Sequence, residues 1–98
     1  MVVVRQSEAF SAWLGDLRDR KAAAKIAARL ARLELGNFGD AEPVGEGVTE
    51  LRIHFGPGYR VYVVQRGEVL VVVLCGGDKS SQDRDIRRAK EMARELEK

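Results

Sequence analysis

The chain has 98 residues, of which 45% are hydrophobic and 33% charged, with a formal net charge of +2 at pH 7. This length suits a single domain over residues 1–98, and the apolar content excludes a disordered tail. The longest apolar run, Val69 to Cys75, is far shorter than the roughly 20 residues that cross a membrane.

Two features of the sequence bear on where the protein is located in the cell: its N-terminus and its cysteine content. Residues 1–5 lack the basic lead and long apolar stretch of a secretory signal. The single cysteine, Cys75, cannot form an internal disulfide or a cysteine-based zinc site. We therefore expect a cytoplasmic protein with no membrane association.

Charge is unevenly distributed along the chain. Residues 16–32 carry six basic and two acidic side chains, whereas residues 33–51 carry five acidic and no basic ones. Residues 52–98 carry ten basic and seven acidic side chains. Two basic zones flanking an acidic segment favour a polyanion or an acidic protein as partner.

The first third of the chain predicts a strand and two helices. Val2 to Val4 is a short apolar run typical of a strand. Residues 8–18 have apolar side chains at helical spacing after Ser7, a suitable N-cap, and Trp13 is expected in the core. A second helix is expected over about residues 20–35, where Gly36-Asn37 follows as a stop signal.

The second predicted helix carries a basic stripe. Its members recur every three or four residues and share one face: Lys21, Lys25, Arg29 and Arg32. Such a stripe is either a solvated face opposite the packed side or a surface that follows phosphates. Both interpretations remain open at the level of the sequence.

The middle of the chain predicts a loop and three strands. Residues 36–47 hold four glycines and Pro43 and are expected to form a loop. Apolar and polar residues alternate over 48–55, which is typical of a half-buried strand. Strands are then expected over Tyr59–Gln65 and, buried throughout, over Val69–Cys75, with glycine-containing turns between them.

A last helix is expected to begin at Ser80, with Asp83 completing a capping box. The resulting order is β-α-α-β-β-β-α, a small α+β fold. We expect the last three strands to form an antiparallel meander, with its apolar face packed against the helices.

One face of the predicted sheet gathers cationic and aromatic groups. Arg52 and His54 lie two residues apart and so share a face, as do Arg60 and Tyr62 on the next strand. Lys79 follows the third strand of this set. The face is either merely solvated or a site for anions, which two arginines and a histidine would favour.

Such a face can cleave RNA with its own side chains. The 2′-hydroxyl attacks the adjacent phosphate, which requires a base, an acid and cations that stabilise the extra negative charge. Arg60, Arg52 and Lys79 suit the last task, and His54 is either the acid or base or an ordinary exposed residue. Tyr62 or Tyr59 can stack a base.

No cofactor is expected from the sequence. One histidine and one cysteine give no metal-ligand cluster, so we expect neither a metal nor an organic cofactor. Gly77-Asp78-Lys79-Ser80 lacks the glycine that a P-loop places directly before its lysine, so nucleotide hydrolysis is not expected either.

Two segments resemble the RelE/ParE superfamily of bacterial toxins. They are residues 50–62 (ELRIHFGPGYRVY) and residues 74–89 (LCGGDKSSQDRDIRRA), and the early Phe10 to Leu17 helix extends the likeness. Together they resemble the phage-derived, HigB-like branch known as addiction module killer proteins. The resemblance implies a curved sheet with two N-terminal helices on one face.

The resemblance also implies a function: the toxin of a type II toxin–antitoxin system. It implies a ribosome-dependent mRNA endoribonuclease with functional cations at Arg60 and Lys79, and less securely at Arg52. Members of the ribonuclease branch have a Tyr or His near the C-terminus, whereas no Tyr or His follows Tyr62 here. His54 is therefore assigned to proton transfer on chemical grounds alone.

The partners expected from the resemblance are a cognate antitoxin, the ribosome and mRNA. The antitoxin would be a small DNA-binding protein encoded next door, with an acidic segment for the basic face. Lys21 and Lys25 are further candidates for RNA contact. The alternative, implied by the ParE branch, is a protein that inhibits DNA gyrase by binding and cleaves nothing.

Overall fold

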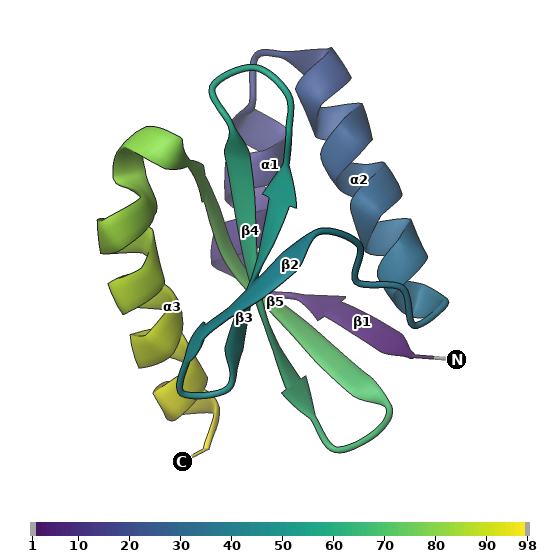
Figure 1. The fold of residues 1–98 in the computed structure, drawn as a ribbon, viewed down its shortest axis with the longest axis vertical. Helices are drawn as coiled ribbons and strands as arrows, with labels where there is room; N and C mark the ends of the chain where they lie inside the picture. The colour runs from purple at the N-terminus through teal and green to yellow at the C-terminus, as the bar shows by residue number, and fades with distance from the viewer. Residues whose placement is uncertain (1, 98) are drawn as a thin grey trace.

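The computed structural model describes residues 2–97, and its core is one mixed sheet between two helical layers (Figure 1). The strands lie in the order β1-β5-β4-β3-β2. The elements are β1 (Val3–Gln6), α1 (Glu8–Asp16), α2 (Arg20–Glu34), β2 (Ala41–Gly45), β3 (Val48–Ile53), β4 (Tyr59–Arg66), β5 (Leu70–Asp78), the 3₁₀ turn η1 (Lys79–Ser81) and α3 (Gln82–Leu96).

The predicted α+β class and order of elements are confirmed, with two differences in the sheet. β1 pairs with β5 in parallel, so the sheet is mixed rather than purely antiparallel. The expected loop over residues 36–47 contains the edge strand β2, which pairs antiparallel with β3. Pro43 is tolerated there because an edge strand leaves one row of N–H positions unpaired.

The first core lies between the sheet and helices α1 and α2. Ser7 caps α1 by accepting a hydrogen bond from the Phe10 amide, as the sequence predicts. Phe10 and Ile26 are fully buried against inward residues of the three central strands, such as Leu51 and Val61. Trp13 packs beside Phe10 and against Tyr59, so its predicted core position is confirmed.

The second core lies on the opposite face, beneath α3. Tyr62, Val64 and Leu74 point to this face and pack against Ala89 and Ala93 of the helix. The expectation that Tyr62 lies on a solvated face is therefore wrong, because α3 covers it and its exposed fraction is 0%. The same helix buries Glu50, which is 1% exposed.

Strand β5 runs further than predicted, through Gly76 and Gly77 to Asp78. A Cβ atom at Gly76 would lie 2.5 Å from the Trp13 ring, and one at Gly77 would collide with the Asp85 carboxylate. Glycine is needed at both positions because helices press on the strand from both faces.

The predicted capping box at Ser80 and Asp83 is wrong. Asp78 caps η1 instead, since its carboxylate accepts hydrogen bonds from the backbone amide and the hydroxyl of Ser80, and Ser81 completes the box. These bonds hold the pKa of Asp78 below its usual value. These hydrogen bonds restrict the conformation of the short turn that joins β5 to α3.

The basic stripe of α2 is broken at Arg29, which is buried. Its guanidinium donates to the carbonyls of Phe38, Asp40 and Arg52 and so fastens the segment before β2 to the end of β3. Burial lowers the pKa of Arg29.

Within residues 2–97, no helix is both long enough and apolar enough to span a membrane.

Candidate functional site

A hollow lies over the turn that joins β3 to β4, and we call it the turn hollow. It is open to solvent and is lined by His54, Phe55, Gly56, Pro57, Gly58, Arg60 and Lys79. Gly56 and Gly58 have positive φ angles, which fold the turn tightly. Three of the predicted site residues thus lie around one hollow: His54, Arg60 and Lys79.

Arg60 lies at the base of the turn hollow, and its side chain is only 11% exposed. Its Nη1 donates a 2.8 Å hydrogen bond to the carbonyl of Gly58. Its Nε is buried and has no hydrogen-bond partner among the described residues, although it lies 3.9 Å from Glu50 Oε1. The guanidinium has five N–H donors, and one of its nitrogens, Nη1, is used in this bond to the turn, while the side chain also lines the open hollow.

Glu50 is a buried carboxylate that connects three elements. Its Oε1 accepts a 3.2 Å hydrogen bond from Arg52 Nε. Its Oε2 accepts from the Tyr62 hydroxyl at 3.1 Å and from Gln82 Nε2 of α3 at 2.8 Å. Each polar atom of this buried carboxylate is thereby satisfied, as burial of a charge requires.

The Glu50 network explains two pKa shifts. Burial, followed by the nearby Glu50 charge, raises the pKa of Tyr62. The hydrogen bond to Glu50 raises the pKa of Arg52. Arg52 lies directly opposite Arg60 in the β3–β4 pairing, so the predicted proximity of the two arginines is confirmed.

His54 forms an exposed pair with Asp40. Its Nε2 is hydrogen-bonded to Asp40 Oδ2, and 74% of the histidine side chain is exposed. This bond is the main reason that the pKa of Asp40 is held below its usual value. A histidine bonded through Nε2 leaves Nδ1 available for exchanging a proton with another molecule.

The aromatic candidates do not lie where the sequence predicts. Tyr62 is sealed beneath α3, and Tyr59 is 8% exposed and packs edge-on against Trp13. Neither tyrosine ring offers a face to a base in this structure. Phe55 is partly buried: it packs against the first core and also lines the turn hollow.

The two lysines proposed for RNA contact, Lys21 and Lys25, are both exposed on α2. The Lys25 ammonium lies 5.1 Å from the centre of the Phe55 ring, within the range of a cation–π contact. Lys25 is thereby placed at the margin of the turn hollow. No such contact places Lys21 there.

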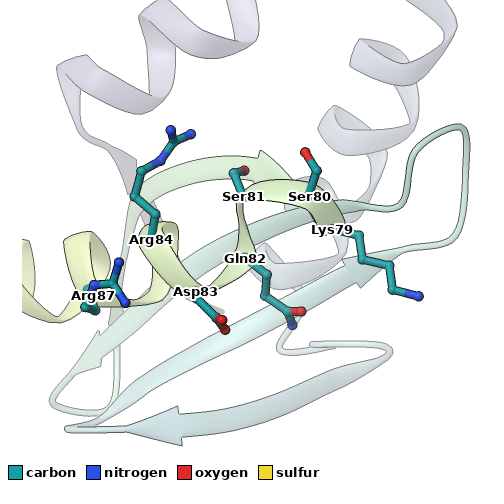
Figure 2. A pocket seen from close by; sticks show the side chains of 7 residues that line it. All are labelled: Lys79, Ser80, Ser81, Gln82, Asp83, Arg84 and Arg87. Carbon is teal, nitrogen blue, oxygen red and sulfur yellow. The ribbon is translucent and has the colours of Figure 1, made fainter.

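Lys79 belongs to two hollows at once. Besides the turn hollow, it lines a second one over η1 and the first turns of α3, which we call the helix hollow (Figure 2). The helix hollow is lined by Lys79, Ser80, Ser81, Gln82, Asp83, Arg84 and Arg87. Lys79 is thus the residue at which the two hollows adjoin.

Sequence reasoning missed the acidic residues of this site. Asp40 lies in the acidic segment before β2, and only its proximity to His54 in space reveals its role. Glu50 alternates with apolar neighbours as an outward strand residue does, and no pattern in the sequence indicates that α3 covers it.

Among residues 2–97, no cluster of three His, Cys, Asp or Glu side chains could hold a metal ion.

Comparison with known proteins gives the chain its family. Residues 12–98 match the family model described as Phage derived protein Gp49-like (DUF891). An uncharacterized protein of Haemophilus influenzae is 50% identical over 95 residues, which cover 97% of this chain and 96% of that protein. The chain belongs to the phage-derived Gp49-like family, a toxin-like family related to addiction module killer proteins.

Proposed function

We propose that this chain is the toxin of a type II toxin–antitoxin system within the RelE/ParE superfamily. In this proposal it is an mRNA endoribonuclease that acts on the translating ribosome and arrests protein synthesis in the cytoplasm. The one observation that carries the proposal is the turn hollow, where Arg60, Lys79 and His54 surround a single open space. Membership of a toxin-like family supports it.

The proposed reaction divides the work among these side chains. The 2′-hydroxyl of the bound RNA attacks the adjacent phosphorus, the bond to the 5′-oxygen breaks, and a 2′,3′-cyclic phosphate forms. Arg60 donates hydrogen bonds to the phosphoryl oxygens as negative charge develops on them. Lys79, which lines the same hollow, adds a point charge.

Proton transfer falls to His54 in this proposal. As a neutral imidazole it takes the 2′-hydroxyl proton through Nδ1, while Asp40 holds the ring at Nε2 and stabilises the imidazolium that forms. The leaving 5′-oxygen receives its proton from water or from the ribosome. Phe55 supplies the aromatic surface against which an exposed base can pack.

The proposed partner in the resting cell is an antitoxin. Arg60 and Lys79 line the turn hollow and Lys25 lies at its margin, which gives a cationic surface to which an acidic segment can bind. Such a segment would occupy the turn hollow and exclude RNA. The proposal therefore expects the antitoxin gene beside the gene for this chain.

The test is cleavage of an mRNA on purified ribosomes by the full chain and by Arg60→Ala. Loss of a donor that stabilises developing charge should lower the cleavage rate by about 100-fold or more. Arg18→Ala is the matched control, because Arg18 is exposed and lines none of the described hollows. Full activity of Arg60→Ala with an intact fold would contradict the proposal.

Inhibition of gyrase is the contrary outcome. Induced expression should reduce incorporation of labelled amino acids before that of thymidine. A prompt block of DNA synthesis, with translation continuing, would replace the ribonuclease proposal with the gyrase one.

Cleavage on the ribosome should also persist under chelation that leaves enough magnesium to keep ribosomes intact. Cleavage that is lost under chelation and restored by zinc or manganese alone would contradict the mechanism.

A further inference from the structure

We infer that the helix hollow binds the sugar-phosphate backbone of single-stranded RNA next to the cleaved bond. This inference rests on the proposed function and adds the path of the RNA strand to it. The path begins at Arg60 in the turn hollow, passes over Lys79 and continues along Arg84 and Arg87 of α3. None of these α3 residues takes part in the proposed chemistry.

The continuity of the path depends on the position of Lys79. A Cβ atom placed on Gly58 would lie 3.0 Å from Arg60 Nη1 and 3.6 Å from Lys79 Cβ. Arg60 and Lys79 therefore both lie close to the same glycine of the turn. A phosphate bound at Arg60 has Lys79 as its next cationic neighbour, and Lys79 leads directly into the helix hollow.

The cations of the helix hollow are available to a ligand. Arg87 is exposed, and neither it nor Lys79 has a side-chain hydrogen bond or ion pair within the described chain. Arg84 is 77% exposed and has only a long contact, 3.8 Å, with Asp85. Asp83 is the one acidic residue that lines this hollow, so cations outnumber it.

The arrangement of these side chains selects an extended ligand. Figure 2 shows Lys79 pointing to one side of the turn and Arg84 and Arg87 to the other, with Asp83 and Gln82 projecting between them. Cations that diverge in this way cannot enclose one compact anion. They can contact successive phosphates of a strand, since three helical residues rise by about 4.5 Å and arginine side chains are long.

The α2 face offers no comparable path. Its stripe is interrupted by Arg29, whose guanidinium is committed to backbone carbonyls. Only Lys25 reaches the turn hollow, by way of Phe55. We therefore assign the exit of the strand to α3 rather than to α2.

The experiment measures binding without cleavage. A fluorescein-labelled single-stranded RNA, 2′-O-methylated throughout so that it cannot react, is titrated with the full chain by anisotropy at several salt concentrations. Arg84→Ala/Arg87→Ala should weaken binding about tenfold at low salt and reduce the slope of log K against log salt by about 1.4, since each phosphate contact contributes about 0.7. Both positions are exposed, so the fold should be kept.

The matched control is Arg5→Ala/Arg18→Ala, which removes the same charge from exposed positions that line none of the described hollows. An equal loss in this control, or an unchanged slope in the α3 variant, would overturn the inference. So would loss of binding to poly-glutamate with RNA binding unchanged, because the surface would then suit an acidic protein. A selective loss of RNA binding in a chain that cleaves nothing would support the path while the proposed reaction fails.

Discussion

Glu50 lies beneath Arg60, with 3.9 Å between the carboxylate Oε1 and the guanidinium Nε. The carboxylate is almost fully buried, yet it contacts two arginines that reach the surface. An acidic group beneath a cationic site fixes the position of the guanidinium without occupying its outward donors. The buried Glu50 carboxylate thus stabilises the positive charges of Arg52 and Arg60.

Glu50→Gln should destabilise the fold by about 1–3 kcal/mol. The change leaves Arg52 and Arg60 without their buried counter-charge, and an amide nitrogen replaces an oxygen that accepts hydrogen bonds. Urea denaturation measures the loss. Glu42→Gln is the control, because Glu42 is 54% exposed and lies 4.0 Å from Arg52. Its effect should stay within about 0.5 kcal/mol, and equal effects of the two substitutions would contradict the network.

Asp40→Asn should remove a contribution to the free energy of unfolding that is present at neutral pH and lost in acid. Because the pKa of Asp40 is lowered in the folded chain, its contribution is complete above the unfolded value of about 4. It is lost as the pH falls through the lowered folded value. The stability difference between wild type and variant should therefore shrink as the pH falls below about 5 and vanish at strongly acidic pH.

Denaturation midpoints at a series of pH values test the Asp40 prediction. Asp16→Asn serves as the control, since Asp16 is exposed and has no described hydrogen bond. A difference for Asp40→Asn that persists unchanged below pH 2 would show that the His54 pair does not produce the shift.

Gly77→Ala should destabilise the fold by about 1–3 kcal/mol, the usual cost of overpacking. The added methyl group would collide with the Asp85 carboxylate and approach Ser81 Oγ to 2.8 Å, which disrupts the 2.5 Å hydrogen bond between those two residues. Gly15→Ala is the opposite case. Nothing lies within 4 Å of its Cβ position on α1, so it should stabilise by about 0.5–1 kcal/mol.

Cys75 should resist alkylation while α3 is docked. Burial raises the pKa of its thiol to about 11, so little thiolate exists at pH 8. Reaction with iodoacetamide in the native state should be slower than in guanidinium by on the order of 100-fold. Mass spectrometry follows the modification. Equal rates in the two states would mean that α3 does not cover β5 in solution.

The helices and the three consecutive strands β3, β4 and β5 could be predicted because their signals are local. Apolar spacing along α1 and α2, the Ser7 cap and the turn glycines each depend on neighbours in the chain. The edge strand β2 could not be predicted in the same way. Pro43 and the flanking glycines are typical of a loop, and only pairing with β3 makes the segment a strand.

Part of the candidate site could also be predicted, because the alternation of side chains along a strand is a local signal. Alternation correctly places Arg52 and Arg60 on one face of the sheet, and the turn brings His54 and Lys79 to the same end. Alternation does not say which faces are covered. A second helical layer turns Glu50 and Tyr62 from surface residues into buried ones, and that layer is a property of the tertiary fold.

The parallel pairing of β1 with β5 has a consequence for the order in which the chain assembles. The Ser7 hydroxyl donates to the Leu74 carbonyl across 67 positions of the sequence, and β1 has no other neighbour in the sheet. During synthesis the first strand must therefore wait until β5 has left the exit tunnel. A nascent chain interrupted before that point lacks Lys79, which lines both the turn hollow and the helix hollow. The surface that carries the two hollows is therefore completed only after β5 and η1 have emerged.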